Sequence, residues 1–143
     1  MAIDPQSFEL LLSTVQRFVR ERLVPAENEL EERDEVPPEL VQAMRELGLF
    51  GLTVPEEWGG IGLSVSQEVQ VNFELGRTAP AFRSVFGTNI GIGSQGILID
   101  GTPELMAQFL PRVASGELIM SFALTEPDAG SDPGAMRTRC RRV

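Results

Sequence analysis

The residue types best suited to bind a ligand lie in residues 121–132, which read SFALTEPDAGSD. A mostly apolar run ends at Thr125, and a loop with proline and glycine follows it, carrying Gly130 and Ser131. Glycine lets a ligand approach the backbone, and loop N–H groups with a nearby hydroxyl can bind a phosphate. The Thr125 hydroxyl could reach the polar edge of a ring packed against the end of the run. The same composition is typical of a capped turn, and the residue types alone leave both interpretations open.

A second pattern with possible chemistry is the glycine spacing of Gly91, Gly93 and Gly96. This spacing matches G-x-G-x-x-G, in which a turn after a strand binds a dinucleotide pyrophosphate at a helix N-terminus. Residues 83–90 look helical and do not form a bounded strand, and the acidic residue expected in a following strand is missing. Small residues that allow close helix packing therefore explain the spacing better.

Other side chains restrict the reaction types that the chain could support. Glu126, Asp128 and Asp132 lack the ligand series and closing glutamate of a calcium loop, so we expect solvated turn carboxylates and no metal site. The sequence contains no histidine, which excludes a Ser-His or Cys-His pair within the chain. Cys140 is the single cysteine, so no intrachain disulfide can form, and a lone thiol beside a strand is more often inert than catalytic. We assign no catalytic residue within the chain.

Length and charge narrow the class of protein further. The 143 residues suffice for one ordinary domain, or for one domain and the beginning of another. The 21 acidic and 12 basic residues give a net charge of −9, which opposes nonspecific nucleic-acid binding. No apolar run approaches the length of a membrane span, and the acidic, proline-containing N-terminus does not resemble a signal peptide. We expect a globular cytoplasmic protein without a nucleic-acid partner or membrane span.

The elements that must position these residues are mostly helical. Apolar residues recur at helical spacing in five segments, residues 5–35, 39–47, 64–77, 81–100 and 103–115. Asp4 and Pro5 are typical of a helix cap and first position, and Pro25 should kink or restart the first helix. Ser64 and Gln67 are spaced as a capping box.

Two other segments break the helical pattern. Residues 49–63 contain many glycines and prolines, which predicts a loop with apolar anchors, of which Trp58 is the largest. Residues 118–124, LIMSFAL, are the first clear β signal. The pattern therefore predicts about five helices and then a switch to β structure near residue 118.

Residues 123–132, ALTEPDAGSD, resemble the signature of acyl-CoA dehydrogenases, the flavoenzymes that introduce an α,β double bond into acyl-CoA thioesters. Three further stretches stand in the order of that family: VPEEWGGIGLS at 54–64, GTNIGIGSQGILIDGT at 87–102 and FLPRVASGE at 109–117. The resemblance implies a mainly α chain. Residues 1–117 would form the N-terminal helical domain, and residues 118–143 the first strand or strands of a β-barrel-like middle domain.

The resemblance also implies a cofactor, FAD, and the residues that contact it: Phe122, Leu124, Thr125, Gly130 and Ser131. Thr125 would hydrogen-bond the pyrimidine side of the isoalloxazine ring. Gly130 and Ser131 would approach the pyrophosphate, with Ser131 also near the thioester. Many relatives carry tyrosine at the Phe122 position, so a contact from a phenol hydroxyl is lost here.

The same resemblance places the acyl chain of the substrate along one helix. Ser84, Thr88 and Ile92 follow i, i+4, i+8 spacing, and with Val85 they resemble the residues that line the acyl channel of the family. These four residues and Ser131 are the predicted contacts of an acyl-CoA substrate.

The resemblance implies that the rest of the enzyme lies outside these 143 residues. The glutamate that removes the α-proton, much of the FAD site and the homotetramer interface would all lie there. The hydride would pass to flavin N5, and electron-transfer flavoprotein would be the electron acceptor. We expect the isolated chain to bind FAD negligibly and to be inactive. Two alternatives remain open: a noncatalytic helical interaction module, and an acyl-CoA oxidase or flavin monooxygenase on the same scaffold.

Overall fold

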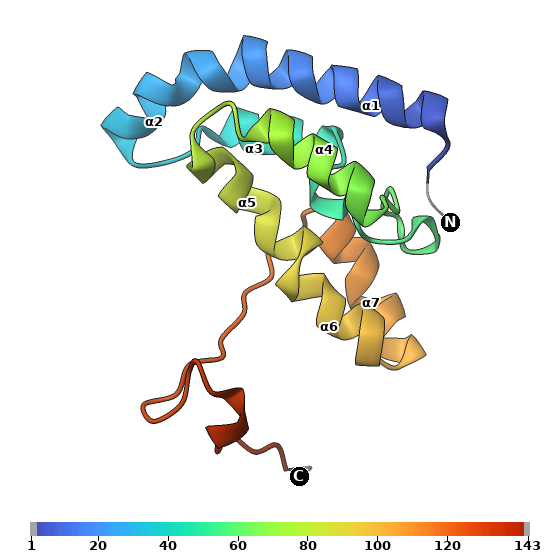
Figure 1. Cartoon of the computed structure of the whole chain (residues 1–143), viewed down its shortest axis with the longest axis vertical. Helices are drawn as coiled ribbons and strands as arrows, with labels where there is room; N and C mark the ends of the chain where they lie inside the picture. The colour runs from blue at the N-terminus through green and yellow to red at the C-terminus, as the bar shows by residue number, and fades with distance from the viewer. Residues whose placement is uncertain (1–2, 142–143) are drawn as a thin grey trace.

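The computed structural model describes residues 3–141, and its regular structure is almost entirely helical (Figure 1). The α-helices within these residues are α1 (Pro5–Phe18), α2 (Glu27–Arg33), α3 (Pro38–Glu46), α4 (Val65–Leu75), α5 (Pro80–Ile90), α6 (Ile92–Asp100) and α7 (Pro103–Ala114). Short 3₁₀ turns occur at Leu49–Gly51, Glu56–Trp58 and Pro133–Ala135. The mainly α fold class predicted from the sequence is confirmed. Each of the five periodic segments is helical, and two of them are interrupted.

The first interruption surrounds Pro25. The Asp4 carboxylate caps α1 by accepting hydrogen bonds from the N–H groups of Gln6 and Ser7, both at 3.0 Å. After Phe18 the chain widens into a π-helical turn at Val19–Leu23, tightens to 3₁₀ at Val24–Ala26 and continues as α2. Proline has no N–H for the carbonyl four residues earlier, and its ring crowds that carbonyl, so a regular α-turn cannot continue there. The predicted disturbance at Pro25 is confirmed.

The second interruption divides the segment predicted as a single helix over residues 81–100. Gly91 adopts φ −115° and ψ −120°, far from helical values, so α5 ends at Ile90 and α6 starts at Ile92. The Thr53 hydroxyl donates a hydrogen bond to the Ile90 carbonyl, which satisfies an acceptor freed by the break. The prediction of one continuous helix was therefore wrong.

The core lies where α1, α3, α4 and α5 meet around the 3₁₀ turn Leu49–Gly51. Its buried apolar side chains are Phe8, Val15, Phe18, Val19, Leu23, Leu30, Leu40, Met44, Leu49, Phe50, Leu52, Leu63, Val71, Leu75, Phe82, Phe86 and Ile90. Phe50 and Phe86 pack edge to face, with ring centroids 6.0 Å apart. The loop at residues 49–63 is thus anchored chiefly by Phe50 and Leu52. Trp58, the anchor expected from its size, is only partly buried and packs on a smaller cluster with Val54 and Leu110.

The switch to β structure is not completed in residues 3–141. Residues 119–125 form no strand, and the isolated bridge between Glu126 and Ala129 is the β pairing within the described part of the chain. Figure 1 shows this segment leaving the helices as a separate arm that ends at the C-terminus. A strand requires the hydrogen-bonding groups of a neighbouring strand, and no extended segment among residues 3–141 pairs with residues 118–124. The strand predicted there is therefore not formed.

No helix among the described residues is both long enough and apolar enough to cross a membrane.

Candidate functional site

The loop with the predicted ligand contacts is closed by a tight turn. The Glu126 N–H donates to the Ala129 carbonyl at 2.7 Å, and the Ala129 N–H donates back to the Glu126 carbonyl at 3.3 Å. This turn brings Thr125 beside Gly130, because a Cβ added to Gly130 would lie 3.5 Å from Cγ2 of Thr125. A glycine next to a threonine hydroxyl leaves room for a ligand to approach the backbone at that point.

The other predicted contacts of this loop are accessible to solvent to different degrees. Phe122 is 57% exposed, Ser131 is exposed, and Leu124 is half-buried. The arm therefore presents a hydroxyl, an aromatic ring and backbone groups to solvent, and it could form one wall of a binding site.

Glu126 fixes the shape of the loop. Its carboxylate accepts hydrogen bonds from the N–H of Arg137 at 2.8 Å, the N–H of Thr138 at 2.7 Å and the Thr138 hydroxyl. The Thr138 hydroxyl, followed by these two N–H groups, lowers the pKa of Glu126 below its ordinary value. We expected a solvated turn carboxylate at this position. The structure shows a turn carboxylate that is open to solvent and also ties residues 137 and 138 back onto the turn.

Asn89 connects the arm to the helices, and the sequence analysis did not single it out. Its side chain is fully buried at the end of α5. Its Nδ2 donates to the carbonyls of Val113 (3.0 Å) and Leu118 (2.7 Å), and its Oδ1 accepts from the N–H of Met120 (2.9 Å). The sequence did contain a signal for this role. Asn89 falls three residues after Phe86, on the apolar face of the helix, and a polar side chain on a buried face is expected to have hydrogen-bond partners.

The predicted acyl-channel residues lie mostly together on α5. A surface groove of about 280 Å³ is lined by Arg83, Ser84, Gly87, Thr88, Gly91 and Ile92. Three of the four predicted residues, Ser84, Thr88 and Ile92, therefore share one groove. Val85 packs against the helical core and does not belong to the groove lining.

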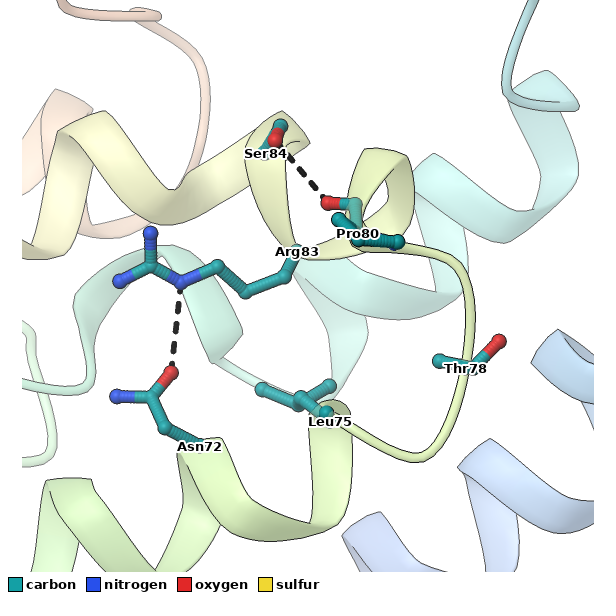
Figure 2. A pocket seen from close by; sticks show the side chains of 7 residues that line it. Asn72, Leu75, Thr78, Pro80, Arg83 and Ser84 are labelled. Carbon is teal, nitrogen blue, oxygen red and sulfur yellow. Dashed lines mark hydrogen bonds between the residues drawn. The ribbon is translucent and has the colours of Figure 1, made fainter.

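A second hollow adjoins this groove between α4 and α5. It measures about 380 Å³ and is lined by Asn72, Leu75, Gly76, Thr78, Pro80, Arg83 and Ser84 (Figure 2). Arg83 and Ser84 line both hollows. Ser84 donates its hydroxyl hydrogen to the Pro80 carbonyl at 3.0 Å, so its oxygen remains available only as an acceptor (Figure 2).

The structure does not bring the loop and the groove together. Hydrogen bonds to Asn89 hold the start of the arm at the junction of α5 and α6, where Met120 packs against Gly93. Beyond Met120 the arm diverges from the helices, and the turn around Ala129 lies well away from α5 (Figure 1). No group of three or more His, Cys, Asp or Glu side chains among the described residues is arranged to hold a metal ion.

Comparison with known proteins identifies the helical part of the chain. Residues 5–117 match the family described as acyl-CoA dehydrogenase, N-terminal domain. The chain belongs to the acyl-CoA dehydrogenase family. The match begins at the first residue of α1 and extends just past α7.

Individual family members resemble the chain over nearly all of its length. It is 42% identical over 135 residues to (2S)-methylsuccinyl-CoA dehydrogenase of Cereibacter sphaeroides, covering 94% of this chain and 24% of that protein. Glutaryl-CoA dehydrogenase from Mycobacterium smegmatis superimposes with a TM-score of 0.80 at 33% identity, covering 96% of this chain and 35% of the other.

An acyl-CoA dehydrogenase from Bacillus anthracis, crystallised in complex with FAD, superimposes with a TM-score of 0.76 at 31% identity. That alignment covers 94% of this chain and 24% of the other. The chain therefore spans roughly a quarter to a third of the length of these relatives, from 24% to 35%.

Proposed function

We propose that these residues are the N-terminal portion of an enzyme that catalyses FAD-dependent α,β-dehydrogenation of an acyl-CoA thioester. In this proposal residues 1–117 form the helical domain, and residues 118–143 begin the middle β domain. The observation that carries it is family membership over residues 5–117, together with the stretch ALTEPDAGSD at residues 123–132. The glutamate that removes the α-proton would lie outside this chain, so none of the residues described above is assigned as the base.

The loop residues fit one side of a bound FAD. Thr125 and Ser131 have exposed side chains, and the turn at residues 126–129 sets Thr125 against Gly130, where the backbone is open to a ligand. Thr125 would bind the ring, and Gly130 and Ser131 the pyrophosphate, while Phe122 and Leu124 would contact the flavin through apolar surface. Bound FAD would supply the hydride acceptor. This chain supplies only the wall of the site that these five residues form.

The groove on α5 is the proposed place of the acyl group. Ser84, Thr88 and Ile92 line it, while Val85 would act from the core side by supporting the helix. Two of the relatives are named for the half-thioesters of dicarboxylic acids, methylsuccinyl-CoA and glutaryl-CoA. Others are named for very long acyl chains, so family membership alone leaves the acyl group open.

The remaining parts of the proposal follow from the family resemblance. Electron-transfer flavoprotein would reoxidise the enzyme, the whole protein would be a homo-oligomer, and its location would be the cytoplasm. A noncatalytic helical module would need none of these features.

The proposal is tested on the whole protein that carries this chain, purified with its bound cofactor. We expect a flavin absorbance spectrum that is bleached by an acyl-CoA under anaerobic conditions and restored by an electron acceptor. Hydrogen peroxide formed in air without an acceptor would identify an oxidase instead. A colourless protein that does not react with any acyl-CoA would favour the interaction module.

The isolated 143-residue chain is the matched control. We expect it to be colourless and inactive, because it supplies only one wall of the FAD site. An isolated chain that is yellow and oxidises acyl-CoA would contradict this part of the proposal.

A further inference from the structure

The Glu27 carboxylate joins the start of α2 to the segment between α4 and α5. Its Oε1 accepts a hydrogen bond from the Thr78 hydroxyl at 2.8 Å and another from the Ala79 N–H at 2.9 Å. Thr78 is buried and Glu27 is half-buried. None of the ion pairs within residues 3–141 involves Glu27. The carboxylate therefore serves this segment of the chain, through hydrogen bonds of the strong, charge-assisted kind.

These contacts supply a cap that α5 does not make with its own side chains. The residue before α5 is Ala79, which has no side-chain oxygen, and the first helical residue is Pro80. In a capping box, a glutamate or glutamine at the third helical position accepts the N–H of the cap residue. The third position of α5 is Phe82, and the acceptor for the Ala79 N–H is Glu27, 52 residues earlier in the chain. By contrast, α1, α4 and α7 each begin with a capping side chain of their own.

The capped segment forms one wall of the hollow between α4 and α5. Thr78 and Pro80 line this hollow, and Figure 2 shows the Thr78 hydroxyl directed away from Arg83. The Pro80 carbonyl accepts the hydroxyl hydrogen of Ser84 at 3.0 Å, and Ser84 lines both this hollow and the acyl groove. A movement of the wall would therefore reach the groove through one hydrogen bond.

We propose that Glu27 is a positioning residue for the acyl group: it fixes the start of α5, and with it the shape of the groove that selects among acyl chains. This inference rests on the proposed dehydrogenase function and adds a residue that governs its selectivity. Glu27 itself lines neither the hollow nor the groove. Without its carboxylate, Thr78 and Ala79 lose their acceptor and the wall can move. A wall that moves accommodates acyl groups of different size, so the discrimination between them falls.

Amide hydrogen exchange of the whole protein with its bound FAD tests the cap. In Glu27→Ala, we expect the amides of residues 79–84 to exchange about tenfold faster or more, because opening the first turn of α5 no longer breaks two hydrogen bonds to a charged group. Glu27→Gln keeps an oxygen that can accept both bonds, and its exchange should stay within about threefold of the wild type. Glu29→Ala removes a carboxylate of the same helix that pairs with Arg33, and should leave these amides unchanged.

The kinetic test measures selectivity on the same proteins. The substrates are butanoyl-CoA, octanoyl-CoA, hexadecanoyl-CoA, glutaryl-CoA and methylsuccinyl-CoA. In Glu27→Ala, the ratio of kcat/KM between the best and the poorest substrate should fall by about threefold or more, which is part of the contribution of one hydrogen bond. The loss should come from a higher KM for the best substrate, with kcat changed less than about twofold. Glu27→Gln and Glu29→Ala should both retain the wild-type ratio.

A double variant tests whether Glu27 acts through the segment that it caps. Thr78→Val keeps the shape of the side chain but removes the hydroxyl that Glu27 accepts, and should lower the same ratio by a smaller factor. Because both changes break one contact, Glu27→Ala combined with Thr78→Val should lose no more than Glu27→Ala alone. Losses that multiply would contradict the path from Glu27 to the groove.

Three further results would overturn the inference. Unchanged exchange at residues 79–84 in Glu27→Ala would show that the carboxylate does not hold the start of α5. Faster exchange with an unchanged selectivity ratio, or with kcat lowered equally for every thioester, would make Glu27 a residue of the fold alone. A flavin that none of the thioesters reduces would remove the proposed function and the acyl role of Glu27 with it, while the exchange rates would still report the cap.

Discussion

Single polar residues determine how the arm leaves the helices. Asn89 is fully buried and satisfies the N–H of Met120 and the carbonyls of Val113 and Leu118. Each of these groups would otherwise lose a partner at a site where water has little access, and an unsatisfied buried group costs more than its hydrogen bond contributes. Asn89 thereby sets the starting point and direction of the segment that contains Phe122 and Thr125.

Replacement of Asn89 by leucine should therefore destabilise the fold by about 1–3 kcal/mol, because leucine keeps the volume but leaves the Met120 N–H unpaired. Urea unfolding of the purified protein measures the change in the free energy of unfolding. Asn28→Leu, the same substitution at an exposed position of α2, is the control and should change stability little. Equal effects of the two substitutions would show that the Asn89 hydrogen bonds contribute nothing specific.

Glu126 makes the closure of the loop sensitive to acid. Its folded pKa is lowered below 4.5 by the Thr138 hydroxyl and by the N–H groups of Arg137 and Thr138. A depressed folded pKa means that the stabilising contacts are fully present above the unfolded value and are lost as pH falls through the folded value. We expect the amide resonances of Arg137 and Thr138 to shift together below pH 4.5 in a titration followed by NMR.

The variant Thr138→Val provides the control for this titration. It removes the hydroxyl that contributes most to the lowered pKa of Glu126, so the transition should move toward a higher pH. Amide resonances that stay constant throughout the acid titration would contradict the role assigned to Glu126.

At the scale of elements, the sequence predicted local features well and long-range features poorly. The cap at Asp4, the capping box at Ser64 and the disturbance at Pro25 depend on neighbouring residues, and the structure has all three. At the break before Gly91, the Ile90 carbonyl accepts a hydrogen bond from Thr53, 37 residues away in the chain, and a local pattern cannot reveal such a partner. The apolar run at 118–124 has strand composition, but composition does not state whether a partner strand lies beside it.

The passage of the arm over α6 gives a prediction at this scale. A Cβ on Gly93 would lie 2.4 Å from Cβ of Met120 and 2.7 Å from the Thr88 carbonyl oxygen. Gly93→Ala should therefore displace the arm or strain α6 and destabilise the protein by about 1–3 kcal/mol. Gly96→Ala, on the same helix with no atom within 4 Å of the added Cβ, should be neutral or stabilising by up to about 1 kcal/mol.

Thermal unfolding followed by circular dichroism distinguishes the two alanine variants. We expect a lower Tm for Gly93→Ala and an unchanged or higher Tm for Gly96→Ala. The reverse order would mean that Met120 does not pack on α6 as the structure shows.

At the scale of the whole molecule, the candidate site is only partly assembled by these residues. The resemblance to acyl-CoA dehydrogenases predicted which residues contact FAD and the substrate. The groove on α5 is lined by Ser84, Thr88 and Ile92, and no residue of the loop at 121–132 belongs to its lining. The predicted flavin contacts and the acyl groove remain on separate parts of the described structure (Figure 1).

The surface of the isolated chain carries apolar side chains in a row on α4. Val65, Val69 and Phe73 follow i, i+4, i+8 spacing and are 77%, 45% and 72% exposed. Contiguous apolar surface of this kind promotes association in water.

We expect the isolated 143-residue chain to elute from a size-exclusion column as concentration-dependent oligomers. The variant Phe73→Gln should shift it toward the monomer, because it removes the largest side chain of the row. Leu10→Gln, at an apolar residue that is 69% exposed on α1, is the control and should leave the elution unchanged. A monomer at every concentration would show that water tolerates this row of side chains without a cover.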